Sequence, residues 1–467
     1  MYLKPRVTKH MKNSSCKQIY CKASSNEENN AFVGIRIKKD SVEFCYPESY
    51  NIKGLDEDKR NVVDINLLRS DIIEILQTIS LAKTRSSASQ LTENGVSYTN
   101  NFSLISYLWI IRDYFSNGLY TNKEKLYRNN AKGRVCWKKT LDTQPIISNG
   151  NIIYNNLVVE VKNDCDTIIT DAHKLCIYDS VRKMGWLFGI SEKAYQVPSP
   201  TKSMLKRYIN SIKQEMTRTF DDVKKIRLVH MLKVLSGVDD SKYISEIVYG
   251  VDKYHYIYER MVDAIFGNVT DIKKYNPNAD WNIMKSASTY SIKPASSLRP
   301  DTLRMEPHPS TCLYNGKTRT AYVLDAKFYR YGTTGLTKDL PETTSIQKQV
   351  TYGKNIIFNF TNEDNVGKVR NAFILPYNKS NHPFTHFEEI EPDRNLIYIG
   401  FAKAKWINEN TSINGDDGIV HAFLLDTKHL ISSWAHGNCQ TDIDNLIKDI
   451  EKYYKSDKSW TIVSEKD

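Results

Sequence analysis

The sequence predicts an α/β fold in which a mixed sheet flanked by helices follows a separate α+β domain at the N-terminus. In the second half of the chain, apolar patterns come in the order helix, hairpin, strand, helix, strand, which is typical of a sheet covered by helices. The chain has 467 residues, enough for two domains with separate cores. We therefore expect one domain over residues 1–200 and a second over residues 201–467.

The first expected domain begins with a polar lead-in over residues 1–30, rich in Lys, Asn and Ser. Residues 31–46 then alternate as two short strands, and residues 62–81 repeat apolar side chains at helical spacing. A second apolar and aromatic helix is expected over residues 102–114. No motif assigns chemistry to this part of the chain, so partner docking is expected of it only by analogy with known subunits.

Cations stand beside an aromatic side chain in residues 126–157. Arg134 precedes Trp137, and Lys138 and Lys139 follow it directly. This composition is typical of a surface that grips a nucleic acid backbone or stacks on a base. The alternative is a tryptophan anchored in the core with lysines facing water, and burial statistics favour that alternative. Partner docking and DNA contact both stay open as roles of the first domain.

Pro198 and Pro200 mark the expected domain boundary. Helical stripes follow over residues 202–235 and 254–266, and the second of these carries Glu259 and ends before Gly267. Farther along the chain, we expect a helix over residues 344–352, strands over residues 371–376, 396–406 and 421–425, and a closing amphipathic helix around residues 443–450.

A β-hairpin is expected between the second of these stripes and the helix over residues 344–352. Two apolar-alternating runs are separated by Asn315-Gly316, a strong turn signal. Asp301 opens the first run, and Asp325 and Lys327 close the second. Because side chains alternate along a strand, Asp325 and Lys327 share one face, and we expect the opposite face to be the buried one.

These charged side chains have the chemistry of a phosphodiesterase site. Two carboxylates brought together repel each other unless a cation lies between them, and oxygen ligands suit Mg²⁺. Lys327 would supply a positive donor beside a water aimed at the phosphate. The alternative is a solvated Asp-x-Lys at a sheet edge. Pro300-Asp301, the hairpin and Asp325-Ala326-Lys327 together match the PD-(D/E)XK nuclease signature, which favours a restriction-endonuclease-like sheet.

Composition agrees with a polyanionic partner. Lys and Arg total 65 against 54 Asp and Glu, a net charge of +11. The sequence shows no signal peptide and no apolar run long enough to span a bilayer, so we expect no membrane association. The eight cysteines lack the repeated spacing of zinc sites, which indicates reduced thiols and a cytoplasmic location.

Other motifs fail on their spacing. Residues 316–318 resemble the end of a phosphate-binding loop, but Thr311 stands where that loop requires glycine, so the chain has no visible nucleotide motor. Cys439 follows His436 closely, yet the sequence places no acid or base partner for a thiol nucleophile. His308 lies among prolines and is expected in a loop.

Several blocks between residues 126 and 352 resemble the LlaJI-type restriction endonuclease family. They are GRVCWKKT with Pro145 and Tyr154, YHYIYERMVDAIFG, LRPD, LDAKFYR, and LP followed by KQVTY. The nuclease subunits of that family are similar in arrangement to the McrC subunit of modified-cytosine restriction systems. The resemblance implies a restriction and phage-defence role, in which a separate McrB-like AAA+ GTPase recognises and translocates double-stranded DNA while this chain cuts it. A homodimer is left open.

The resemblance also implies roles for single residues. Asp301 and Asp325 would be metal ligands, Lys327 the catalytic lysine, Glu259 a supporting acid and further ligand, and Gln349 the polar residue of the following helix. The implied cofactor is Mg²⁺, for which Mn²⁺ can substitute. Two positions depart from the family pattern, because tyrosine precedes Glu259 where tryptophan is more usual, and lysine stands at position 139 where arginine is common.

The leading hypothesis is therefore a Mg²⁺-dependent DNA endonuclease that leaves a 5′-phosphate. In it, the two aspartates hold the metal and Lys327 helps to deprotonate or position the attacking water. The alternative is a catalytically silent nuclease fold that recruits a motor to DNA, against which the intact set of two aspartates and a lysine argues. A nuclease acting on RNA or on single strands is a third possibility that the sequence does not exclude.

Overall fold

The computed structural model describes residues 18–24, 32–38, 40–56, 62, 64–85, 103–149, 151–191, 195–240, 247–307, 319–384, 393–407, 418–437 and 439–455. The chain divides into two compact units. Unit 1 is built mainly from Thr99–Tyr249, and unit 2 from Tyr20–Ile35, Glu43–Tyr98 and Gly250–Asp467. The expected boundary at residue 200 falls within unit 1, because the helices on either side of the two prolines pack against each other.

Unit 1 contains a group of helices that pack on one another: α3 (Leu104–Asn117), α5 (Ile168–Phe188), α6 (Lys202–Arg218) and α7 (Asp222–Asp240). The sequence predicts one helix over residues 202–235, and this prediction is wrong in one respect. The chain breaks after Arg218, and the Asp221 carboxylate accepts hydrogen bonds from the backbone N–H groups of Val223 and Lys224. That cap starts a second helix.

Small strands make up the rest of unit 1. Strands β4 (Asn122–Asn129), β8 (Val158–Cys165) and β5 (Arg134–Val135) form an antiparallel sheet in the order β4-β8-β5. The short helix α4 (Trp137–Leu141) follows β5, and the hairpin of β6 (Ile146–Ser148) and β7 (Asn151–Ile153) comes next. The isoleucines of this hairpin are exposed.

A second sheet has the strand order β1-β3-β2-β9, with β1 at Gln18–Ser24, β2 at Val33–Ile37, β3 at Ser41–Pro47 and β9 at Ile247–Val251. The two strands expected over residues 31–46 are confirmed as β2 and β3. The helix expected over residues 62–81 is confirmed as α1 (Ile65–Arg85). Leu68, Ile72 and Ile75 recur on the buried stripe of α1, as helical spacing requires.

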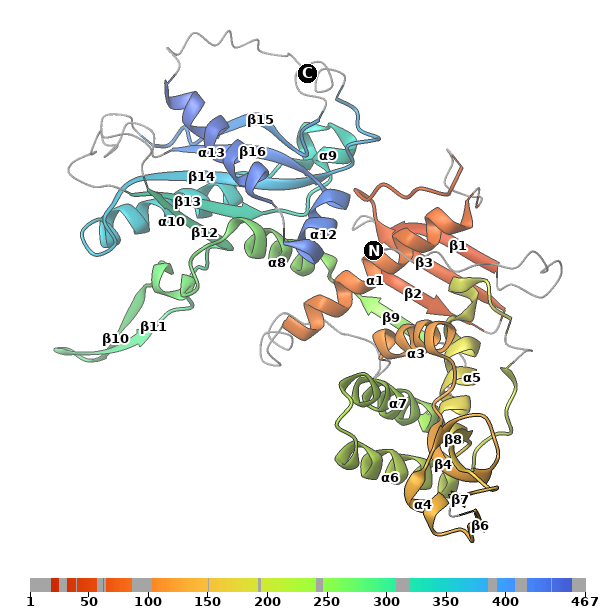
Figure 1. Cartoon of the computed structure of the whole chain (residues 1–467). Coiled ribbons are helices and arrows are strands. Elements are labelled where there is room, and N and C mark those ends of the chain that lie inside the picture. The colour runs from red at the N-terminus through yellow and green to blue at the C-terminus, as the bar shows by residue number, and fades with distance from the viewer. Residues whose placement is uncertain are drawn as a thin grey trace. The chain divides into compact units, whose positions relative to one another are not determined.

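The main sheet of unit 2 has five strands in the order β12-β13-β14-β16-β15 (Figure 1). They are β12 (Thr302–Pro307), β13 (Arg319–Ala326), β14 (Val366–Tyr377), β15 (Leu396–Lys403) and β16 (Ile419–Asp426). The outer pairs are antiparallel and the inner pairs parallel, so the sheet is mixed, as predicted. The hairpin is confirmed as β12 and β13, while its expected turn at Asn315-Gly316 lies outside the described residues.

Helices cover both faces of this sheet. Helix α10 (Thr343–Phe360), which links β13 to the parallel strand β14, packs on Leu303, Ala321 and Val323. On the other face, Glu451 of α13 (Gln440–Lys455) accepts a hydrogen bond from the Tyr322 hydroxyl. Every residue of β13 after Arg319 is therefore buried. The expectation that only one face of this strand is buried is wrong.

Two helices and a second hairpin lie beside the main sheet in unit 2. Helix α8 (Tyr254–Phe266) packs on β12 and β13, and helix α12 (Thr427–His436) packs on α8 and β16. Between α8 and β12, strands β10 (Asp280–Ser286) and β11 (Thr289–Pro294) form an antiparallel hairpin that extends away from the sheet (Figure 1).

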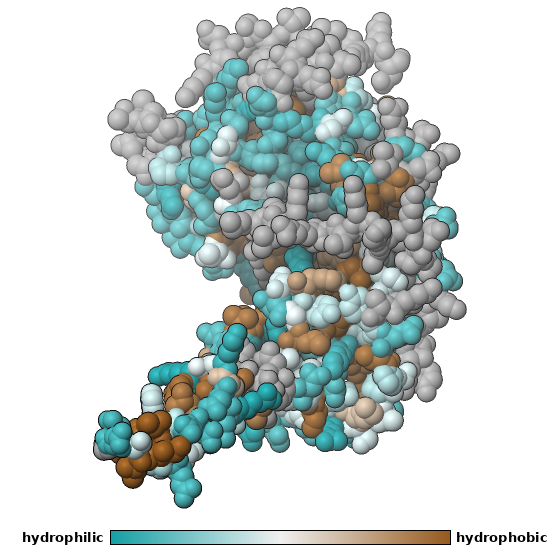
Figure 2. All heavy atoms as spheres, turned by 45° about the vertical axis from the view of Figure 1, so that its right-hand side comes forward, coloured by the Kyte–Doolittle hydropathy of each residue, from teal (hydrophilic) through white to brown (hydrophobic). Residues whose placement is uncertain are grey.

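Apolar side chains are exposed in a few places on an otherwise hydrophilic surface, and Figure 2 shows such patches on the face in view. Both hairpins contribute, with Trp281, Met284 and Ile292 exposed on β10 and β11, and Ile147 and Ile152 exposed on β6 and β7. Among the described helices, none combines the length and the hydropathy that a transmembrane segment requires.

Candidate active site

Three charged side chains meet at one end of the β12–β13 pair. Thr302 is paired with Leu324, so one step outward along each strand brings Asp301 opposite Asp325. The Lys327 Nζ atom lies 2.8 Å from Asp325 Oδ1 and 4.0 Å from Asp301 Oδ2. The structure thus brings together the three residues that the sequence analysis singled out, and the strand pairing is what positions them.

The site is closed at its base and open at its rim. The Asp325 side chain is 4% exposed, whereas those of Asp301 and Lys327 are each 26% exposed. The backbone N–H of Lys327 donates to the carbonyl of Ile374 in β14, which holds the residue at the strand end. Lys327 and Asp301 are therefore partly accessible to solvent, while Asp325 is anchored in the sheet.

Glu259 joins this cluster from helix α8. Burial raises the pKa of Glu259 to about 7, with the negative charge of Asp325 adding to the rise and Lys327 opposing it. The helix is held in place by Tyr258, which is fully buried and packs on the Phe328 ring at a centroid distance of 5.3 Å. The acid expected on a helix before the hairpin thus lies within electrostatic reach of the other three residues.

The cluster holds more negative charge than its single lysine balances. Burial raises the pKa of Asp301 well above its usual range, and the hydrogen bond to Asp325 and the charges of Asp325 and Glu259 raise it further. Burial lowers the pKa of Lys327, but the carboxylates of Asp325 and Asp301 outweigh that effect and the net pKa is raised. Asp301 Oδ2 is buried and accepts no hydrogen bond from any described residue. An orphaned carboxylate oxygen beside further acids is a suitable ligand for a hard cation.

Two residues at the site were missed in the sequence analysis. Tyr352 of α10 is buried, and burial followed by the negative charges of Asp325 and Asp301 raises its pKa to about 12. His255 lies one helical turn before Glu259, and burial, Lys253 and Lys327 lower its pKa. The sequence signals were present, because Tyr352 ends the KQVTY block and His255 has i, i+4 spacing to Glu259.

Gln349 lies on the helix that follows the hairpin, as expected, and is buried between α10 and the sheet. Its side chain is fully buried, and its amide nitrogen donates to the backbone carbonyls of Val323 in β13 and Ala372 in β14. Gln349 therefore joins α10 to β13 and β14. Its contact in β13, Val323, lies two residues before Asp325. The polar group that α10 turns toward the carboxylates is the hydroxyl of Tyr352, about one turn farther along the helix.

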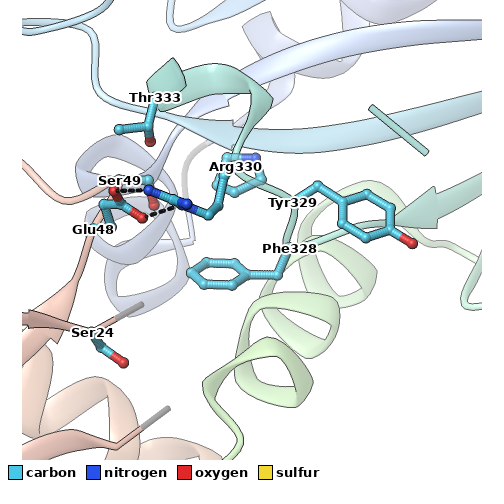
Figure 3. A pocket seen from close by; sticks show the side chains of 8 residues that line it. Ser24, Glu48, Ser49, Phe328, Tyr329, Arg330 and Thr333 are labelled. Carbon is cyan, nitrogen blue, oxygen red and sulfur yellow. Dashed lines mark hydrogen bonds and ion pairs between the residues drawn. The ribbon is translucent and has the colours of Figure 1, made fainter. Parts of the chain in front are cut away.

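Contacts of Phe328 and Arg330 hold the segment after Lys327 in place. Arg330 makes a bidentate ion pair with Glu48, at 2.8 Å and 2.9 Å, and Phe328 and Tyr329 point to opposite sides of the chain (Figure 3). These residues line a small pocket together with Ser24, Ser49 and Thr333. Because Glu48 pairs with Arg330, this pocket offers little free positive charge to an anion, and the ion pair holds Arg330, three residues after Lys327.

The aromatic and cationic segment of unit 1 is a surface feature. The Trp137 side chain is 60% exposed, so the alternative of a core tryptophan is wrong. Arg134 and Lys138 are also exposed, and Lys139 Nζ lies 3.5 Å from the ring centroid of Tyr127. The small sheet of β4, β8 and β5 has too little core to bury an indole, which explains the outcome.

Comparison with known proteins adds two findings. A family model described as LlaJI restriction endonuclease matches residues 32–402. A chain in a solved structure, the refined half-complex from a tetradecameric assembly of Thermococcus gammatolerans McrB AAA+ hexamers with bound McrC, is similar at 12% identity and a TM-score of 0.33. That match covers 85% of this chain and 77% of the other. No protein of curated function matches.

Proposed function

Because this chain belongs to the LlaJI restriction endonuclease family, we propose that it is the subunit of a restriction system that hydrolyses phosphodiester bonds of duplex DNA. The observation that carries this proposal is the meeting of Asp301, Asp325 and Lys327 at a partly open strand end. Two acids and a lysine in this arrangement suit phosphoryl chemistry, where charge stabilisation and positioning do most of the work.

We also assign the main sheet to the PD-(D/E)XK nuclease type. Its support is the order of parts along the chain: an acid before β12, an acid and a lysine at the end of β13, and then α10 leading to the parallel strand β14. Glu259 of helix α8 comes before the β12–β13 hairpin in the sequence and adds a third acid to this set. This arrangement is the one that the PD-(D/E)XK signature predicts.

The residues present fit a divalent cation with a preference for oxygen. Asp301 and Asp325 would hold Mg²⁺, or Mn²⁺ in its place, and Glu259 would complete the set directly or through a water. The orphaned oxygen of Asp301 and the crowding of three carboxylates support this fit. When bound, such a cation neutralises charge on the scissile phosphate and makes a water more acidic.

The protein side chains have separable tasks. The raised pKa of Lys327 keeps it protonated at neutral pH, so we assign it to holding a phosphate oxygen and orienting the attacking water rather than to removing a proton. Glu259, with its pKa raised to about 7 before a cation binds, is better matched than Lys327 to accept a proton at neutral pH when it contacts the cation only through a water. Arg330 and Phe328 keep Lys327 in position through contacts with Glu48 and Tyr258.

We further propose a McrB-like AAA+ GTPase as the partner that finds and moves along the DNA. This partnership is what the family resemblance implies, and the missing phosphate-binding loop of this chain agrees with it. The exposed Trp137 surface of unit 1 is a candidate contact for DNA. Two copies of the chain acting together would allow both strands of a duplex to be cut.

The direct test is cleavage of duplex DNA by Asp325→Asn and Lys327→Ala variants, with Mg²⁺ and with and without the AAA+ partner and GTP. We expect each variant to cut at least about 10²-fold more slowly, since each removes a charge that acts on the reacting phosphate. The exposed residues Asp271 and Lys338 provide matched controls as Asp271→Asn and Lys338→Ala, which should cut normally.

The outcomes separate the competing functions. Undiminished cleavage by both site variants would remove the proposed site. A wild-type chain that binds DNA and its partner but cuts under none of these conditions would favour the silent recruiting subunit instead. Selective cutting of RNA or single strands would redirect the proposal to that substrate class.

A further inference from the structure

A second cluster of potential metal ligands lies away from the candidate active site, where helix α12 meets the start of α13. One donor atom each from His429, Cys439 and Asp442 lies within 4.8 Å of the other two. His429 projects from the first turn of α12, Cys439 immediately precedes α13, and Asp442 lies in the first turn of α13. The three residues thus come from two helices and the link between them.

Hydrogen bonds also link the side chains of this cluster. His429 Nε2 lies 2.7 Å from Asp442 Oδ2, and Ser433 Oγ lies 3.3 Å from the same nitrogen. A hydrogen bond from His429 would satisfy the carboxylate of Asp442, which is 5% exposed. The Cys439 thiol hydrogen-bonds the Ser433 side chain in turn, so the case for a cation rests on three different ligand types that lie within 4.8 Å of one another.

A thiol nucleophile is also a poor fit. A Cys-His-Asp triad uses the two ring nitrogens of histidine in opposite directions, one toward the acid and one toward the nucleophile. Here His429 turns one nitrogen, Nε2, toward both Asp442 and Ser433. The three donor atoms lie close enough together for a single cation to contact all of them.

The chemical types of the three donor atoms indicate which cation would bind. One nitrogen, one sulfur and one carboxylate oxygen form a mixed set that suits Zn²⁺, whereas Mg²⁺ and Ca²⁺ prefer oxygen alone. Zinc is bound by three or four such ligands in tetrahedral geometry. Ser433 or a water would stand at the fourth position.

We propose that His429, Cys439 and Asp442 form a structural zinc site that fastens α12 to α13. Helix α13 covers the sheet through Glu451, and α12 packs on α8, the helix that carries Glu259. A cation at this junction would join the two covering helices by bonds stronger than the single His429–Asp442 contact. It would brace the support of the candidate active site without taking part in its chemistry.

The test uses cobalt, because a Co²⁺–thiolate bond absorbs light in a way that oxygen ligands do not reproduce. The full-length chain, stripped of metal, is titrated with Co²⁺ and then with Zn²⁺. We expect a thiolate charge-transfer band that saturates at one Co²⁺ per chain and is displaced by Zn²⁺. Carboxylates of the candidate active site cannot produce this band, so the result is independent of the proposed function.

Variants assign the band to the cluster. Cys439→Ser and His429→Ala should each lose it, whereas Cys136→Ser and the exposed His436→Ala should keep it. Zinc should also raise the melting temperature of the wild-type chain by more than that of Cys439→Ser, which keeps the carboxylates of the candidate active site. A wild-type chain without a thiolate band, or a band that persists in Cys439→Ser, would overturn the proposal, and the first of these outcomes needs no variant that folds.

Discussion

At the scale of the residue, the polar side chains around Asp325 differ mainly in how deeply they are buried. Asp325 is almost fully buried, while Lys327, two positions on, is a quarter exposed. Tyr352 is as deeply buried as a core residue, yet its pKa responds to the carboxylates of the site. The hydroxyl hydrogen-bonds the Arg299 backbone and lies within electrostatic reach of two acids, so we assign it the task of helping to orient those acids.

Changing Tyr352 to Phe tests that task. The substitution keeps the packing of the ring on α10 and removes only the hydroxyl, so the melting temperature should change little. The Mg²⁺ concentration needed for half-maximal cleavage should rise about 10-fold, because residues that orient metal ligands typically affect affinity by this amount. The control is Tyr329→Phe, whose exposed ring points away from the segment's packed side. Coincident Mg²⁺ titrations of wild type and Tyr352→Phe would show that the hydroxyl has no such role.

At the scale of the element, local sequence patterns predict helices and strands, whereas they miss features that depend on packing or on a helix cap. Alternation of apolar residues predicts β12 and β13, and helical spacing predicts α8 and α10, because these signals involve neighbours along the chain. The break between α6 and α7 was missed, since the apolar stripe continues past Asp221 and only the cap reveals the restart. Trp137 was misjudged because a small sheet cannot enclose it.

The exposed Trp137 surface leads to a prediction about DNA affinity. Trp137→Ala should weaken binding to DNA by about 10-fold, the usual value of one stacked base, and Lys138→Ala should lower the salt dependence by roughly one counterion. Binding is measured by fluorescence anisotropy over a range of salt concentrations. The exposed residues Phe220 and Lys206 serve as controls in the same unit, as Phe220→Ala and Lys206→Ala. Unchanged DNA affinity combined with weaker binding of the AAA+ partner would assign the surface to docking instead.

At the scale of the whole molecule, each unit contains a fully buried histidine that ionises with difficulty. His173 in unit 1 accepts a hydrogen bond from the Tyr120 backbone N–H, and burial followed by Arg227 lowers its pKa to about 4. His421 in unit 2 lies between the hydroxyls of Tyr398 and Tyr454, and burial followed by Arg370 lowers its pKa to about 3.

These histidines predict loss of stability in mild acid. Their folded-state pKa values lie below the unfolded value of 6.5, so their contribution is complete above pH 6.5 and is lost as the pH falls toward the folded-state pKa. His173 alone should account for roughly 2–3 kcal/mol between pH 7.5 and pH 4.5. Urea unfolding at pH 7.5 and 4.5 measures this difference.

A His173→Asn variant keeps an acceptor for the Tyr120 N–H but cannot ionise, so the free energy of unfolding of unit 1 should depend less on pH in this variant. His436→Ala, at an exposed position, should leave the pH dependence unchanged. Equal pH dependence in wild type and His173→Asn would show that the buried histidine is not the group that responds.

The sequence by itself determined the mixed α/β class, the hairpin with two acids and a lysine at one end, and the helix that carries Glu259. Each of these depends on residues close together in the chain, whose periodicity and order are visible without a structure. Only the tertiary structure decided which stretches form each unit, that both faces of β13 are buried, and that Tyr352 and His255 belong to the site while Gln349 lies inside. It also brought His429, Cys439 and Asp442 to one point. Those features depend on contacts between residues that are far apart in the chain. Such contacts leave no periodic pattern in the sequence.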